Sequence, residues 1–160
     1  MPDDRSDRGN SLAAEVIDKF LIIEQLTRYH HAVDFKQWDD LDAILTEDCT
    51  ASWPGLGVVR GLPTDNPNGR EAIKDWLKAA VGEGTSLHYM VNHVVEVDRD
   101  RAANRSMVAI GDEYSNLYHL GHYDGAHFRT PDGWRISALQ FVVAPAAKRR
   151  PMRVEQKSFG

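Results

Sequence analysis

The sequence predicts a single α+β domain in which three N-terminal helices pack against a curved antiparallel sheet. Apolar residues recur at three- and four-residue steps through three stretches of the first half of the chain, which is the pattern of amphipathic helices. The period then changes to two through four stretches that are joined by short polar turns. Helical and strand patterns segregated in this way are typical of an α+β domain, and we expect a cavity between the two layers.

The first helix is expected from Ser11 to about Val33, within a domain that spans residues 11–144. The Ser11 hydroxyl can cap free backbone N–H groups at its start. Residues 1–10 are charged and polar and predict a disordered N-terminal tail, and residues 145–160 predict a basic C-terminal tail. The apolar stripe of this helix comprises Val16, Phe20, Ile23, Leu26, Tyr29 and Val33.

Two further helices flank an early strand. The second helix covers about Gln37 to Leu45 and ends at residues 46–48, and the third covers Arg70 to Val81. Between them, Cys49 to Val59 predicts a short strand, and residues 61–69 predict a loop rich in Gly, Pro and Asn. The four later strands are expected at Ser86 to Val97, Ala102 to Leu117, Tyr118 to Arg129 and Trp134 to Val143.

The strand predicted from residue 86 to residue 97 is apolar on both faces, so both faces are expected to be covered. Even-numbered His88, Met90 and Asn92 would then face the helices and the cavity. The opposite face would be an outer apolar surface of the sheet, which predicts a homodimer or homotrimer formed through it.

The composition limits the kind of partner. A formal net charge of -5 gives no support for nucleic-acid binding, and no apolar run approaches the roughly 18 residues of a membrane span. The single cysteine, Cys49, fits a cytoplasmic location. Its acidic neighbour Asp48 disfavours a thiolate, so we expect Cys49 to be structural.

Seven histidines raise the question of a metal site, but their spacing argues against one. On a regular strand, residues an odd number apart point to opposite faces. The pairs His88/His93, His119/His122 and His122/His127 are all separated by odd numbers, and the sequence has no HExxH motif or Cys–His cluster. We therefore expect no metal.

The end of the first helix gathers groups suited to acid–base chemistry, namely Tyr29, His30, His31 and Asp34. His30 and Asp34 share a helix face, whereas Tyr29 and Asp34 would lie about 140° apart on an unbroken helix. A buried carboxylate beside an imidazole fixes the tautomer of the ring and stabilises the imidazolium that forms on proton uptake. The sequence has no GxSxG-like turn, so proton transfer is favoured over covalent catalysis. Alternatively, Asp34 could simply cap the next helix.

A set of segments between Ile17 and Val143 carries a family resemblance when taken in order. They are Ile23-Glu24-Gln25-Leu26, Val33-Asp34, Trp38-Asp39-Asp40-Leu41, Gly69-Arg70-Glu71-Ala72-Ile73, Leu87-His88, Asn92-His93-Val94-Val95-Glu96, Gly121-His122-Tyr123 and Asp132-Gly133-Trp134. In these segments the chain resembles the nuclear transport factor two-like superfamily, in its SnoaL-like and scytalone-dehydratase-like branch. The resemblance implies a cone-shaped α+β barrel, with a curved antiparallel sheet wrapped around three helices and a mostly apolar pocket.

The resemblance also implies roles for particular residues. Scytalone dehydratase, hexachlorocyclohexane dehydrochlorinase and bile-acid 7α-dehydratases use an aspartate and a histidine that fall by position on Asp34 and His88. His88 would remove a proton, Asp34 would orient it, and Tyr29 would donate a proton or a hydrogen bond to a leaving oxygen or a carbonyl. The expected pocket walls are Trp53, Met90, Asn92, Met107, Tyr123 and Phe141. His30 and His31 are left with surface or packing roles, and His122 faces outward if Tyr123 points inward.

The function implied by the resemblance is that of a cofactor-independent lyase, a dehydratase acting on a small apolar cyclic substrate. The alternatives are a double-bond isomerase or polyketide-cyclase-like enzyme with the same base. From another class, the chain could be a non-catalytic ligand-binding module or the small structural subunit of a ring-hydroxylating dioxygenase. The dehydrochlorinase and the bile-acid enzymes carry an arginine on the last strand. This chain has no arginine between Arg135 and Arg149, which argues against halide or coenzyme A-linked substrates.

Overall fold

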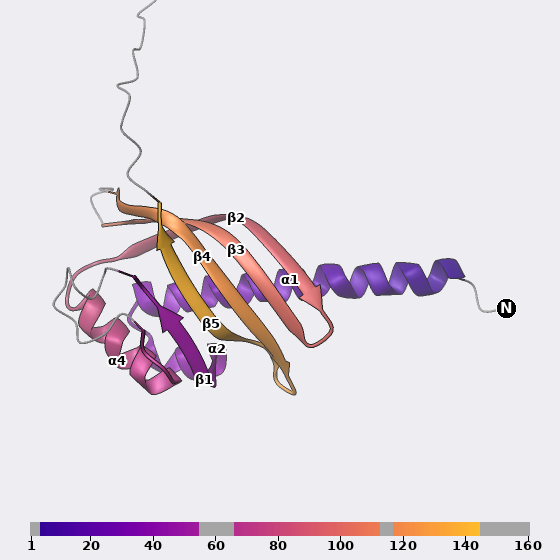
Figure 1. Cartoon of the computed structure of the whole chain (residues 1–160), viewed down its shortest axis with the longest axis horizontal. Helices are drawn as coiled ribbons and strands as arrows, with labels where there is room; N and C mark the ends of the chain where they lie inside the picture. The colour runs from indigo at the N-terminus through magenta and orange to yellow at the C-terminus, as the bar shows by residue number, and fades with distance from the viewer. Residues whose placement is uncertain (1–3, 55–65, 113–116, 145–160) are drawn as a thin grey trace, which may run out of the picture.

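A computed structural model describes residues 4–54, 66–112 and 117–144, and it shows a five-stranded sheet with helices packed against it (Figure 1). The elements are α1 (Asp4–Asp34), η1 (Trp38–Asp40), α2 (Leu41–Ile44), β1 (Leu45–Ser52), α4 (Arg70–Val81), β2 (Leu87–Asp98), β3 (Arg101–Gly111), β4 (Leu117–Thr130) and β5 (Gly133–Val143). The end of the predicted early strand, most of the loop predicted at 61–69 and the basic tail lie outside the described residues. None of the described helices is long and apolar enough to cross a membrane.

The strands lie in the order β1-β5-β4-β3-β2. Strands β2 to β5 form the predicted antiparallel meander, and β1 pairs parallel to β5 at one edge, which makes the sheet mixed. β1 begins at Leu45, so Thr46 to Asp48 belong to this strand rather than ending the second helix as predicted. The second strand of the meander ends at Gly111, earlier than predicted.

The first helix is longer than predicted and its N-terminal half projects beyond the sheet (Figure 1). It begins at Asp4, so most of the tail predicted to be disordered is helical. Val16 and Phe20, two members of the predicted buried stripe, are 58% and 65% exposed, because they lie on the face of α1 opposite to Asp18, which contacts Arg129 and Trp134. Further along the helix, Leu26 and Val33 are buried as predicted.

A bulge in strand β2 changes which of its side chains point toward the helices. Its pairing with β3 shifts between Val91 and Val94, and Asn92 has a φ of 54°, a left-handed conformation that Asn tolerates better than most residues. His88, before the bulge, and His93, after it, both point inward, although five positions separate them. The rule of strict alternation was therefore wrong for this pair.

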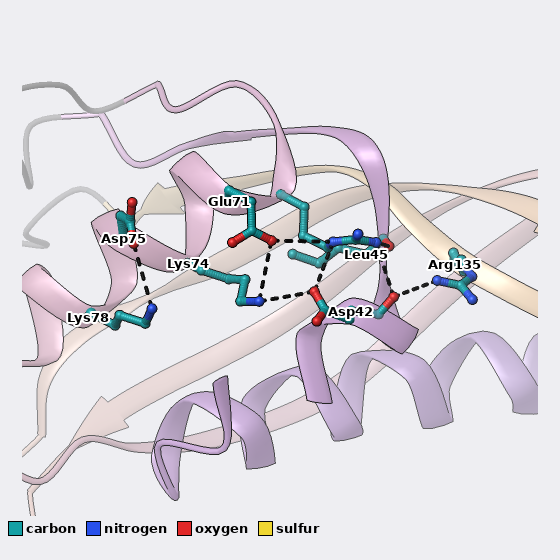
Figure 2. Close-up of polar contacts among 8 residues, drawn as sticks. Asp42, Leu45, Glu71, Lys74, Asp75, Lys78 and Arg135 are labelled. Carbon is teal, nitrogen blue, oxygen red and sulfur yellow. Dashed lines mark hydrogen bonds and ion pairs between the residues drawn. The ribbon is translucent and has the colours of Figure 1, made fainter. Parts of the chain in front are cut away.

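Helix α4 is held against the α2–β1 corner by a network of charges (Figure 2). The ammonium of Lys74 lies 3.0 Å from a carboxylate oxygen of Asp42 and 3.3 Å from Glu71. Arg70 pairs with the same Asp42 oxygen at 3.0 Å, and Arg135 of β5 donates to the Asp42 carbonyl at 2.6 Å. The network therefore ties α4, which supplies one wall of the cavity described below, to the sheet.

A second anchor joins α1 to the β4–β5 turn. Arg129 donates two hydrogen bonds, of 2.9 and 2.6 Å, to the carboxylate of Asp18, and Trp134 Nε1 donates to the same group at 2.9 Å. The guanidinium also lies 4.3 Å from the Trp134 ring centroid. These contacts hold the pKa of Asp18 below its usual value and fix the direction in which α1 crosses the sheet.

Candidate active site

Asp34, the last residue of α1, lies against His88 near the start of β2. Its Oδ1 is 2.5 Å from His88 Nδ1, and its Oδ2 accepts the backbone N–H of His88 at 3.0 Å. Both side chains are only 8% exposed. An ionised carboxylate can only accept, so Nδ1 carries the hydrogen of this contact, and in the corresponding neutral tautomer Nε2 holds the lone pair. The contact predicted from the sequence is present, and Asp34 does not cap the next helix, which has no side-chain cap.

His88 lines a cavity of about 270 Å³ between the helices and the sheet. This is slightly below the range of about 300–1,000 Å³ typical of small-molecule sites, so it suits a small ligand. From α1 the cavity is lined by Tyr29 and Val33, which share a helix face, while Asp34 is not among the lining residues and reaches the cavity only through its contact with His88. The other lining residues are Val33, Trp53, Trp76, Leu77, Ala80, Val81, Gly84, Thr85, Ser86, Ile110, His119, Tyr123 and Phe141. No Asp, Glu, Lys or Arg is among the described residues that line it, so a neutral ligand fits best.

Two tyrosines and two tryptophans make up the aromatic part of the wall. Trp53 and Trp76 stack with ring centroids 4.1 Å apart and an interplanar angle of 6°. Trp53 Nε1 donates a hydrogen bond to the Tyr123 hydroxyl at 3.3 Å, whereas the buried hydroxyl of Tyr29 has no partner among the described residues. Burial raises the pKa of Tyr123 to about 12 and raises that of Tyr29 well above 10, so both phenols stay protonated at neutral pH.

His30 is buried beside the dyad, a position that the sequence did not predict. Its ring centroid lies 4.7 Å from that of His88 and 5.0 Å from that of Tyr29. Nδ1 donates to the Leu26 carbonyl at 2.9 Å, so Nε2 is an acceptor, and it has no partner among the described residues. Burial, followed by the nearby His88, lowers the pKa of His30 well below 6.5 and keeps the ring neutral. The sequence signals that could have predicted its place near the site were its four-residue spacing from Asp34 on one helix and its position next to Tyr29.

The remaining predicted walls divide into two groups. Trp53, Tyr123 and Phe141 line the cavity, and Met90 is partly buried against the core without lining it. The prediction that Asn92 and Met107 line the cavity was wrong, because both side chains are exposed. Asn92 is exposed because of the bulge, and Met107 because it belongs to the outer face of β3.

Three further histidines lie on β4, and the first two, His119 and His122, are near the cavity end of the strand. His122, 3.6 Å from Asp124, faces outward while Tyr123 is buried, as predicted. His119 lines the cavity, and the sequence analysis did not predict it. The available signal was that His119 and Tyr123 are four residues apart on one strand and therefore share a face.

A buried polar chain continues from the site along the inner face of the sheet. His93 Nδ1 is 2.8 Å from Ser106 Oγ, Asn104 donates to the same oxygen at 2.9 Å, and His127 Nε2 lies 2.8 Å from the Asn104 amide oxygen. Among the described residues there is no cluster of three or more His, Cys, Asp or Glu side chains that could hold a metal ion. Cys49 is buried, and burial followed by Asp48 raises its pKa to about 12, which fits a structural residue.

Comparison with known proteins agrees with this architecture. The family model of the SnoaL-like domain matches residues 14–140. An uncharacterised protein of Mycobacterium tuberculosis is 35% identical over 136 residues, which cover 81% of this chain and 88% of that protein.

Solved structures show a similar fold. A protein of Kribbella flavida aligns with a TM-score of 0.69 and 26% identity over 82% of this chain and 93% of its own. A nuclear transport factor two-like protein from Novosphingobium aromaticivorans aligns with a TM-score of 0.72 and 20% identity over 92% and 95% of the two chains. A candidate scytalone dehydratase from the same organism gives a TM-score of 0.67 and 19% identity over 86% and 89%. At such identities the last two similarities concern the fold alone.

Proposed function

Because the chain belongs to the SnoaL-like domain family, we propose that it is a cofactor-independent lyase that dehydrates a small, apolar, cyclic compound. The family includes isomerases, dehydratases and cyclases, and its members share the nuclear transport factor two-like fold seen in this chain. The observation that carries the proposal is the nearly buried Asp34–His88 pair, whose His88 ring lines a cavity with no Asp, Glu, Lys or Arg among its described lining residues.

The residues of the pair suit the removal of a proton from carbon. His88 Nε2 takes the proton, and the carboxylate of Asp34 holds Nδ1–H and stabilises the imidazolium that results. The Tyr29 hydroxyl, protonated and without a partner among the described residues, donates a hydrogen bond to an oxygen of the substrate. The apolar and aromatic walls exclude water, which strengthens these electrostatic interactions.

A panel of cyclic β-hydroxy ketones tests the proposal, since dehydration yields a conjugated enone that absorbs in the ultraviolet. We expect His88→Gln and Asp34→Asn to lower turnover by about a hundredfold or more, the range of general acid–base catalysis. His122→Gln, on the outer face, is the matched control and should leave turnover unchanged. If both site variants bound ligand normally and no member of the panel turned over in the wild type, a binding module would be the better description.

An isomerase with the same base is the alternative within this proposal, because dehydration and double-bond migration begin with the same proton abstraction. The products separate them. Cyclic β,γ-unsaturated ketones become conjugated without losing water, so release of water measured by product mass identifies the lyase.

A further inference from the structure

We propose that His30 is a positioning residue for the base: a neutral imidazole that packs against the His88 ring and, together with Asp34, holds Nε2 of His88 toward the cavity. The inference rests on the proposed function and adds one residue to the group that carries it out. His30 is not among the residues that line the cavity, so it acts on a substrate only through His88.

Helix α1 contacts the His88 ring with two side chains that lie one turn apart. Asp34 accepts the hydrogen on Nδ1 at 2.5 Å, and the His30 ring lies against the same imidazole, with 4.7 Å between the ring centroids and an interplanar angle of 46°. Residues four positions apart share a helix face, so one face of α1 supplies both contacts. One hydrogen bond to the edge of a ring lets the ring rock, whereas a second contact on the ring restricts that motion.

His30 is itself held in one orientation. Its side chain is 3% exposed, and its ring meets the rings of Tyr29 and Tyr123 at 87° and 69°, with centroids 5.0 and 5.2 Å away. The terminal torsion of an aromatic side chain is broad, so packing alone leaves the rotation of the ring loosely defined. The 2.9 Å hydrogen bond from Nδ1 to the Leu26 carbonyl fixes that rotation.

The neutrality of His30 suits a place beside a base. His88 becomes an imidazolium when it takes a proton, and a positive charge on the neighbouring ring would oppose that step, whereas a neutral ring does not. Burial, followed by the nearby His88, keeps the pKa of His30 well below 6.5. The buried support of the base therefore stays uncharged while the base itself changes its charge.

An unpaired nitrogen distinguishes a positioning role from a purely structural one. Nε2 of His30 is a buried acceptor with no partner among the described residues, and such an atom lowers stability. A phenyl ring of similar shape would remove the acceptor, so packing alone favours Phe at this position. A histidine retained at such a cost points to a role that needs the Nδ1–H donor.

Two variants of His30 test the inference, with turnover measured on a cyclic β-hydroxy ketone. His30→Phe keeps a ring and loses the donor, and His30→Asn keeps a donor near the Nδ1 position and loses the ring. We expect each to lower kcat about tenfold or more, because the base is no longer held in place, and to leave KM unchanged. The Tm of His30→Phe should stay at or above that of the wild type, which a structural role for His30 does not predict together with a lower kcat.

The proton on Nδ1 of His88 gives a second measurement that needs no substrate. In the wild type we expect it to exchange slowly with solvent, because it lies in a 2.5 Å contact within a nearly buried pair. Proton NMR of the free protein should show exchange about tenfold faster in His30→Phe, because the loosened ring opens more often.

His31→Phe is the matched control, because His31 is the next residue but is exposed and packs on Phe35, with ring centroids 5.5 Å apart. It should leave kcat and the exchange rate unchanged. The inference is overturned if His30→Phe keeps the kcat of the wild type, or if it exchanges the His88 proton as slowly as the wild type does. Failure of the proposed function looks different: the wild type would then turn over no member of the panel, while exchange of the His88 proton would still depend on His30.

Discussion

At Asp34, one carboxylate makes two contacts with the same neighbour, to the ring Nδ1 and to the backbone N–H of His88. Both contacts require an acceptor, so the carboxylate specifies the tautomer of the ring as well as its position. His30 has its own tautomer fixed by the Leu26 carbonyl. The sequence could identify these side chains as acid–base groups. It could not show which imidazole faces which carboxylate, because that depends on where β2 crosses the end of α1.

The tautomer of His88 can be tested directly. In Asp34→Asn the amide has one donor group and one acceptor group in place of two acceptor oxygens, so it cannot accept both the Nδ1–H and the backbone N–H. We expect a mixture of tautomers in which part of the population carries the hydrogen on Nε2 and has lost its base. Nitrogen NMR shifts of the His88 ring measure this. A ring that kept the hydrogen on Nδ1 in the variant, as in the wild type, would contradict it.

Buried histidines should make the protein sensitive to mild acid. Burial lowers the pKa of His30 well below 6.5 and that of His127 to about 4. The unfolded chain takes up these protons near pH 6.5 and the folded chain does not, so stability is complete above about pH 6.5 and falls as the pH drops toward 4. Each histidine contributes at most about 1.4 kcal/mol per pH unit. Urea denaturation at pH 7, 6 and 5 measures the slope, and His127→Gln should reduce it; a flat profile would contradict the prediction.

At the scale of elements, patterns with local causes were predicted best. α4 was predicted with its observed bounds, and β2, β4 and β5 within about one residue. Helical and strand periodicity and short turns depend on residues close together in the sequence, so the sequence alone can predict them. Features that depend on distant contacts were not: the parallel pairing of β1 with β5, the bulge at Asn92, and the exposure of Val16 and Phe20. The bulge is why Asn92 was wrongly expected in the cavity, whereas Met107 was wrongly expected there although it shares the exposed, odd-numbered face of β3 with Arg101 and Arg105.

The charge network behind α4 should contribute measurably to stability. The Lys74 side chain is 7% exposed and its pKa is raised by Asp42, whereas Asp42 itself is half-exposed, so solvent weakens the pair. We expect Lys74→Met to cost about 1 kcal/mol and to lower Tm by about 2–4 °C. Lys78→Met is the matched control on the same helix, since Lys78 is 46% exposed and pairs at 3.6 Å with an exposed carboxylate. If Lys74→Met and Lys78→Met lowered Tm equally, the burial of Lys74 would not account for its contribution to stability.

In the part of the chain that the structure describes, exposed apolar side chains gather on two surfaces of the molecule. The outer face of the sheet carries Tyr89, Val91, Met107 and Leu120, on three neighbouring strands. The projecting half of α1 carries Leu12, Val16, Ile17 and Phe20. Contiguous apolar patches of this kind are uncommon on monomers. We propose that copies of the chain associate through the sheet face, where exposed apolar side chains of three neighbouring strands lie side by side.

Charge at the centre of the sheet face should then disrupt association. Met107→Asp would bury a carboxylate in the interface, so we expect a shift from dimer or trimer to monomer in light scattering coupled to size-exclusion chromatography. Leu12→Asp, an equivalent change on α1, is the control and should leave the oligomer intact. The opposite pattern would assign the interface to the helix.

The bulge in β2 has a consequence for how the strand can vary. It shifts the phase of the side chains: residues before Asn92, such as His88, face the cavity, while those after it, such as Val95, pack against α1. The two halves of β2 each have a separate inward-facing set of side chains. A substitution in the half that lines the cavity therefore leaves the packing of the other half against α1 unchanged. Deleting Asn92 would remove the extra residue and restore regular pairing with His93 and Val95 still facing inward, whereas straightening the bulge without a deletion would turn every later side chain of the strand to the opposite face.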